Sequence, residues 1–106
     1  MPREAVTIEK IEIQNVNTPG RVERVDRAKY EAMRKALVSV LGKSPTGLTV
    51  AEAKAGLLPL LPGDLFPEGA TAGWWLKAVQ LDLEAKRLVR RDNSKPLRLH
   101  IQEPQS

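Results

Sequence analysis

Cations that could pair with phosphate are concentrated in two separate parts of the sequence. The 106-residue chain has a formal net charge of +4, and its positive excess lies in residues 27–43 and 87–106. Lysine and arginine on exposed elements bind phosphate oxygens without reading the base sequence. The pattern favours duplex DNA as a partner, and the side chains predicted to contact it are Arg34, Lys35, Thr71, Lys77, Arg90, Arg91, Lys95 and Arg98.

The stretch from residue 71 to residue 86, which would have to contact the bases, is poor in such groups. Lys77 is its only cation before Lys86, and Asp82 and Glu84 would border phosphate at a Coulombic cost. Apart from Gln80, it has no side chain that could read a base edge bidentately. Charged residues on the C-terminal ribbon are equally explained as a solvated edge that deters strand pairing. The sequence leaves both interpretations open.

Two adjacent tryptophans, Trp74 and Trp75, cannot both enter one core, because neighbouring helical residues point about 100° apart. We expect Trp75 in the core, and Trp74 packed under the N-terminal strands or under the loop at residues 65–66. A sharper hypothesis is an apolar patch for a dimer or protein partner, since aromatic anchors concentrate at such sites. That patch would consist of Trp74, Ala78 and Leu81.

The composition argues against an enzyme. The chain has no cysteine, which excludes disulfides, thiolate zinc sites and cysteine nucleophiles. Its only histidine, His100, alternates on the outward side of a predicted strand, where a solvated surface role is the usual one. No serine has a base in a recognisable motif, and no glycine-rich phosphate loop is present. We therefore expect no catalytic residue, no metal and no cofactor.

Local signals place the elements that must position these residues. Residues 7–16 and 21–25 read as short strands around a type II turn, whose geometry leaves open whether they pair directly. Asp26 can cap a first helix, whose apolar stripe is Tyr30, Met33, Leu37, Val40 and Leu41. Thr49 and Glu52 match a capping box that begins a second helix, and Pro59 should end that helix near Leu58.

A third helix is expected from a Thr71 cap to Lys86, and it is apolar nearly all round. Alternating residues then predict a two-stranded ribbon, with a turn at residues 92–96. The order indicates an α+β chain, and specifically a winged helix-turn-helix domain with three helices, a C-terminal β-ribbon wing and N-terminal short strands. We expect one domain over residues 10–102, a partly ordered stretch at 1–9 and a frayed tail at 103–106.

Residues 83–91, LEAKRLVRR, resemble the helix-to-wing junction of bacterial winged-helix regulators of the multiple-antibiotic-resistance type. Those families usually have a helix-ending glycine where this chain has Arg87. More closely, the chain is similar to a family of small bacterial proteins with no assigned activity. The motifs that carry this similarity are residues 17–21 (NTPGR), 25–33, 65–75 (ending in AGWW) and 79–86 (VQLDLEAK). The resemblance implies a winged-helix-like fold and transfers no functional residue.

The N-terminus lacks the apolar segment of a signal peptide, and no apolar run approaches the ~18 residues of a membrane span. We expect a cytoplasmic protein without a membrane partner. The leading hypothesis is DNA binding or transcriptional regulation through phosphate contacts by the basic wing. The alternative is a protein-interaction or dimerisation module that keeps the fold without binding DNA.

Overall fold

The computed structural model describes residues 9–93 and 95–102. It begins with a hairpin of two antiparallel strands, β1 (Lys10–Gln14) and β2 (Val22–Asp26), so the two N-terminal strands do pair directly. Alternation turns Ile13 and Val25 inward, which gives the hairpin one apolar face. The expectations for residues 1–8 and 103–106 lie outside the described residues.

Helices α1 (Arg27–Gly42) and α2 (Val50–Leu57) begin where the sequence predicts. The Asp26 carboxylate accepts from the Lys29 amide at 3.1 Å, and Thr49 and Glu52 form the complete capping box. Pro59 ends regular helix as expected, and the chain continues as a short 3₁₀ turn, η1 (Leu58–Leu60). A second 3₁₀ turn, η2 (Pro67–Gly69), lies in the loop before the third helix.

Helix α3 (Ala72–Ala85) starts differently from the prediction. Thr71 precedes it with a left-handed backbone, φ 60°, and its hydroxyl donates to the Ala70 carbonyl at 2.6 Å. The Thr71 side chain therefore does not cap the helix, because an N-cap needs an extended backbone that aims the oxygen at the first-turn amides. The expected cap at Thr71 was wrong.

The end of α3 keeps a glycine-like geometry at Arg87. Its φ is 64°, its amide donates to the Glu84 carbonyl at 3.1 Å, and the Leu88 amide donates to the Leu83 carbonyl at 2.8 Å. This paired arrangement is the Schellman motif that commonly ends helices. A left-handed backbone costs a residue with a β-carbon roughly 1 kcal/mol, so Arg87 carries strain that glycine would not.

The C-terminal ribbon is part of a small three-stranded sheet. Strands β4 (Val89–Asp92) and β5 (Arg98–Ile101) pair antiparallel, and β3 (Leu48–Thr49) pairs with the other edge of β5, which gives the order β3-β5-β4. Val89 and Leu99 turn into the core from this sheet. The described residues thus form an α+β structure with three α-helices and two small antiparallel sheets.

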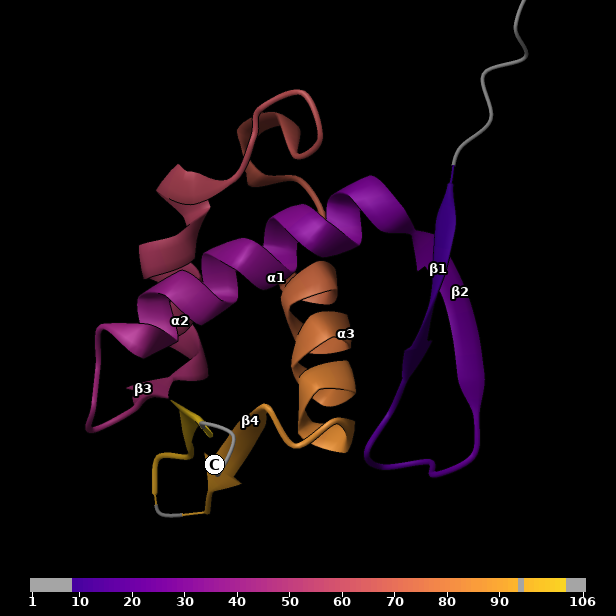
Figure 1. Cartoon of the computed structure of the whole chain (residues 1–106). Helices are drawn as coiled ribbons and strands as arrows, with labels where there is room; N and C mark the ends of the chain where they lie inside the picture. The colour runs from indigo at the N-terminus through magenta and orange to yellow at the C-terminus, as the bar shows by residue number, and fades with distance from the viewer. Residues whose placement is uncertain (1–8, 94, 103–106) are drawn as a thin grey trace, which may run out of the picture.

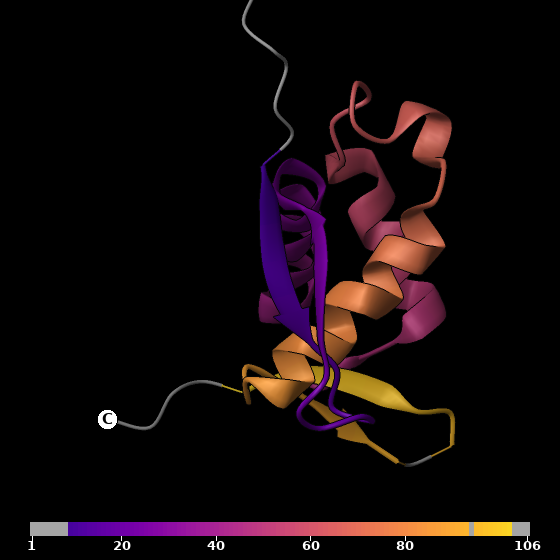
Figure 2. The ribbon, with the colours of Figure 1, turned by 90° about the vertical axis from the view of Figure 1, so that its right-hand side faces the viewer.

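Helix α3 occupies the middle of the molecule (Figure 1), where it contacts α1, α2, the N-terminal hairpin and β4. Figure 2 shows the hairpin running along α3 and the ribbon closing the lower end. Leu76, Val79 and Leu83 of α3 meet Met33 and Leu37 of α1 in one buried cluster. No helix among the described residues is long and apolar enough to cross a membrane.

Candidate nucleic-acid interface

The Asp82 carboxylate on α3 is fully buried, with 0% of the residue exposed. Its Oδ2 accepts from the Tyr30 hydroxyl of α1 at 2.5 Å and from the Lys86 ammonium at 2.8 Å. Its Oδ1 accepts from the backbone N–H of Gln14 in β1 at 2.8 Å. The Lys86 ammonium also lies 5.7 Å from the centre of the Tyr30 ring. Asp82 therefore joins the hairpin to two helices and does not face a ligand.

The environment of Tyr30 sets a pH dependence. Burial of the hydroxyl first, and then its hydrogen bond to Asp82, raise the pKa of Tyr30 above its ordinary value of 10.0. The unfolded chain releases this proton near pH 10 while the folded protein keeps it, so this contribution to stability is complete below pH 10 and falls as the pH rises above it. Tyr30 is the only tyrosine, so tyrosinate absorbance reports it directly. In a pH titration of the folded protein, we expect this absorbance to rise only when the protein unfolds. In denaturant, we expect it to rise near pH 10.

A folded protein that shows full tyrosinate absorbance near pH 10 would contradict this assignment. The matched variant is Tyr30→Phe, which removes the titrating group and keeps the ring. Its free energy of unfolding should be lower than that of the wild type at neutral pH, and should decrease less between neutral and alkaline pH.

The second carboxylate of α3, Glu84, is also engaged inside the protein. Arg91 of β4 donates to it through Nε at 2.8 Å and through Nη2 at 3.1 Å, and the Gln80 amide donates to it at 2.7 Å. Bidentate pairs of this kind are among the stronger hydrogen bonds in proteins. Arg91 was expected to bind phosphate, but its guanidinium is committed to Glu84, and Gln80 is committed with it.

A groove of about 320 Å³ lies between α2, α3 and the ribbon. Lys77 is exposed on its α3 wall, and Lys54 approaches from α2. The Lys54 Nζ lies 3.5 Å from the point where a β-carbon on Gly73 would stand, so this ammonium reaches the first turn of α3. Neither lysine has a carboxylate within 4.0 Å among the described residues. The groove therefore presents two uncompensated cations.

The ribbon supplies less positive charge to the groove than expected. In the β4–β5 register, Arg90 lies opposite His100, and both alternate with the core-facing Val89 and Leu99, so they occupy the outer face of the sheet. Arg98 lies on the same outer face and donates to the Gly47 carbonyl at 3.2 Å. Of the four ribbon cations that were predicted, only Arg91 lines the groove, and it is paired with Glu84, whereas Lys95 is exposed at the turn of the ribbon.

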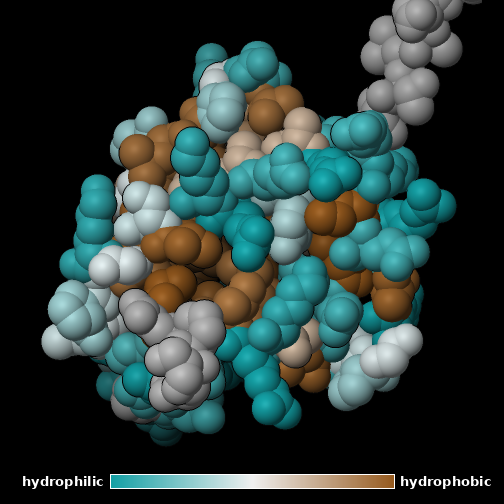
Figure 3. All heavy atoms as spheres, viewed as in Figure 1, coloured by the Kyte–Doolittle hydropathy of each residue, from teal (hydrophilic) through white to brown (hydrophobic). Residues whose placement is uncertain are grey.

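Arg34 and Lys35 are exposed on α1, outside the residues that line the groove. Figure 2 places α1 behind the hairpin, on the side away from the turn of the ribbon. The face on which α1 lies (Figure 3) has apolar side chains gathered below that helix. These two cations therefore do not line the same groove as Lys77, and their contact with phosphate stays a prediction.

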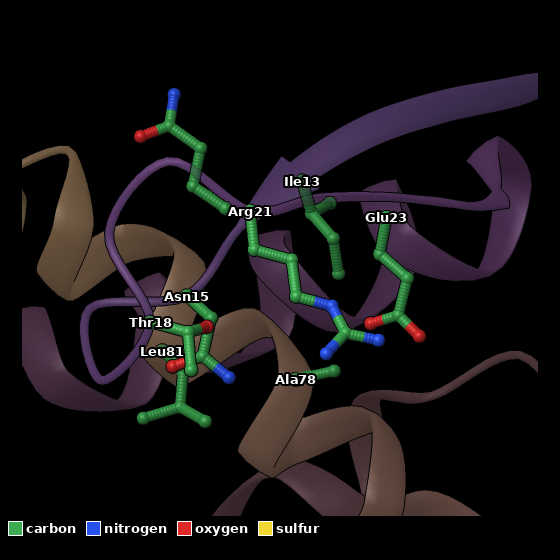
Figure 4. A pocket seen from close by; sticks show the side chains of 8 residues that line it. Ile13, Asn15, Thr18, Arg21, Glu23, Ala78 and Leu81 are labelled. Carbon is green, nitrogen blue, oxygen red and sulfur yellow. The ribbon is translucent and has the colours of Figure 1, made fainter.

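The expected partner patch is mostly covered. Leu81 is only 7% exposed, and its carbonyl accepts from the Val16 amide of the hairpin loop at 3.3 Å. A cavity of about 140 Å³ separates the loop from α3 here, and Figure 4 shows Arg21 reaching over Ala78 beside Glu23. Trp74 instead is 54% exposed, so the expectation that it packs under the strands or the loop was also wrong. The three residues do not form one accessible apolar surface.

Residues 10–99 match a family of unknown function, DUF6958. The chain belongs to this family. Among curated proteins and among solved structures, none matched the chain. Membership in DUF6958 confirms the expected similarity to a family without an assigned activity, and it leaves the winged-helix and bacterial parts of that expectation as predictions.

Sequence reasoning on this DUF6958 member missed Lys54 and Gly73. Both lie in segments that read only as helix, and nothing in their spacing shows that α2 brings one against the other. The available signal was indirect: Ala53 and Leu57, four residues apart, form the buried side of α2, which leaves Lys54 on an outward side. Among residues 9–93 and 95–102, no group of three or more histidines and acidic side chains is placed to hold a metal ion.

Proposed function

We propose that this protein binds duplex DNA through the groove between α2, α3 and the ribbon, on a winged-helix arrangement of these elements. The order helix, strand, helix, helix, strand, strand supports that arrangement, as does the antiparallel order β3-β5-β4. In such domains the third helix enters the major groove and the ribbon contacts the flanking backbone. The N-terminal half of α3 and the turn of the ribbon lie on the same side of the molecule (Figure 2).

The observation that carries this proposal is the internal use of both α3 carboxylates. Asp82 and Glu84 would repel phosphate if they faced solvent, at a cost of about 1 kcal/mol or more per close pair. Asp82 is enclosed by Tyr30, Lys86 and the hairpin, and Glu84 is clamped by Arg91. The exposed groove face of α3 is therefore positive, although the formal charges of Lys77, Asp82 and Glu84 give the helix a net charge of −1.

The contacts available are point charges and not base-reading groups. Lys54, Lys77 and Lys95 can neutralise phosphates, whereas Gln80, the best candidate for reading a base edge, donates to Glu84. Binding of this kind is sequence-tolerant, has a dissociation constant of about 10⁻⁴–10⁻⁶ M at physiological salt, and weakens steeply as salt is added.

The test is fluorescence anisotropy of a labelled mixed-sequence duplex, titrated with protein at several salt concentrations. Lys54→Glu/Lys77→Glu should abolish binding at moderate salt, and alanine at either lysine should lower the salt slope by about one. Arg34→Glu/Lys35→Glu makes the same change in net charge on α1, away from the groove, and should retain most of the affinity. Circular dichroism checks that each variant is folded.

Two results would overturn the proposal. If the wild type does not bind duplex at low salt, DNA binding is excluded. If the two charge-reversed pairs weaken binding equally, the groove is not the site and only net charge matters. The alternative, a protein-interaction module, is supported less, because the hairpin covers Leu81 and leaves Trp74 as the exposed apolar residue of the expected patch.

A further inference from the structure

Trp74 has the highest exposed fraction, 54%, of any large apolar side chain in the described residues. It lies in the first turn of α3, and its neighbours Gly73 and Lys77 on the helix surface both line the groove. A tryptophan contributes most to binding when its large surface is buried, so a half-exposed tryptophan close to the groove lysines Lys54 and Lys77 is a candidate contact for a ligand.

The Trp74 ring is supported from below by other aromatic rings. It meets Trp75 edge to face, with ring centres 5.0 Å apart and planes at 79°, and Trp75 meets Phe66 in the same way at 6.5 Å and 84°. Trp75 and Phe66 are both buried. This chain of three rings runs from the core to the surface, so it holds the exposed indole in a defined orientation. A ring held in this way loses little side-chain entropy when a ligand stacks on it.

The surroundings of Trp74 suit an anion-bearing ligand better than a protein. Leu81 is covered by the hairpin, and Ala78, one turn along α3, lies under the Arg21 guanidinium (Figure 4). Lys77 and Lys54 stand on the groove side without a carboxylate within 4.0 Å in the described part of the chain. A stable protein interface needs about 800 Å² per partner, far more than one indole with charged neighbours offers.

We propose that Trp74 stacks on a nucleobase that has left the base stack, so that the preferred ligand is duplex DNA with an unpaired base. The proposal rests on the nucleic-acid binding proposed above and names its ligand more closely. Inside an intact duplex both faces of a base are covered by its neighbours, and the single indole N–H gives little base-edge recognition. An unpaired base costs little to extrude and offers a free π-face. The lysines then hold the phosphates on either side of it.

The experiment compares three labelled duplexes of the same sequence: fully paired, with one unpaired thymine, and with an abasic residue in place of that thymine. The wild type should bind the thymine bulge about tenfold more tightly than the other two, within the range of base–aromatic stacking. Binding of the bulge should also quench the emission of Trp74, since Trp75, the other of the two tryptophans, is buried.

Two variants separate stacking from electrostatics. Trp74→Leu keeps an apolar residue but removes the π-face, and it should erase the preference for the bulge while leaving paired-duplex affinity within about twofold. Trp74→Phe keeps a smaller π-face, so it should retain most of the preference and lose most of the quenching.

Equal affinity for the thymine bulge and the abasic duplex would overturn the proposal, as would an unchanged preference in a folded Trp74→Leu. Failure to bind any duplex would overturn the proposed function as well, whereas binding without preference would overturn the stacking alone. Sedimentation provides a further check: a wild-type dimer that Trp74→Leu converts to a folded monomer would assign Trp74 to a protein interface instead.

Discussion

Replacing Asp82 by alanine is expected to lower the free energy of unfolding by about 2–4 kcal/mol, since it leaves a buried donor without its acceptor and a cavity in place of the carboxylate. The change leaves the Tyr30 hydroxyl, the Gln14 amide and the Lys86 ammonium without their acceptor. The buried Tyr30 hydroxyl then carries the largest desolvation cost, because the Lys86 side chain is partly exposed to water. Equilibrium denaturation in urea, followed by circular dichroism, measures the loss.

This effect is large relative to the 5–15 kcal/mol of a typical domain, so Asp82→Ala approaches the limit at which a small protein still folds. The matched control is Glu31→Ala, which breaks an exposed pair with Arg27 at the same i,i+4 spacing as that of Asp82 and Lys86. That control should leave the unfolding midpoint unchanged, because exposed pairs contribute little. If both variants unfold at similar urea concentrations, Asp82 is not the joint between the hairpin and the helices.

Replacing Gly47 by alanine is expected to destabilise the protein by about 2–3 kcal/mol through backbone strain and overpacking together. Gly47 has φ +83°, and an added β-carbon would stand 2.6 Å from Cε1 and 2.7 Å from Nε2 of His100. His100 was expected on the solvated side of its strand, but its side chain is only 12% exposed and lies against this glycine. Urea denaturation again provides the measurement.

Gly20 separates the two contributions. Its φ is +89°, close to that of Gly47, but nothing lies within 4 Å of where its β-carbon would be. Gly20→Ala should therefore cost only the strain, roughly 1 kcal/mol. In the Gly47→Ala background, His100→Ala should recover part of the loss, since it removes the ring that collides. Equal losses at Gly20 and Gly47 would show that the histidine ring turns aside freely.

Much of the element order could be read from local signals. The starts of α1 and α2 follow from Asp26 and from the Thr49–Glu52 capping box, and the end of α2 follows from Pro59. These signals operate between residues three or four apart, so spacing in the sequence contains nearly all of the relevant geometry. The ribbon was predicted for a similar reason, since alternation is a property of neighbouring residues.

The predictions that failed depend on contacts between distant segments. Asp82 was weighed as a charge facing phosphate, yet its donors include Tyr30 and Gln14, 52 and 68 residues away along the chain. Leu81 was placed in an accessible patch, yet the hairpin loop covers it. A helix that is apolar on two faces must be covered on both, but periodicity does not say by which element.

By itself, the sequence determined an α+β chain in which three helices are followed by a basic ribbon, because caps, apolar stripes and alternation are local properties. Only the tertiary structure decided which charges remain available. In the folded protein Asp82 is buried and Glu84 is paired with Arg91. Arg90 and Arg98 lie on the outer face of the sheet, and Lys54 lies beside Gly73. A charge acts on a ligand only if no nearer partner satisfies it, and the nearest partner in space is often remote in sequence.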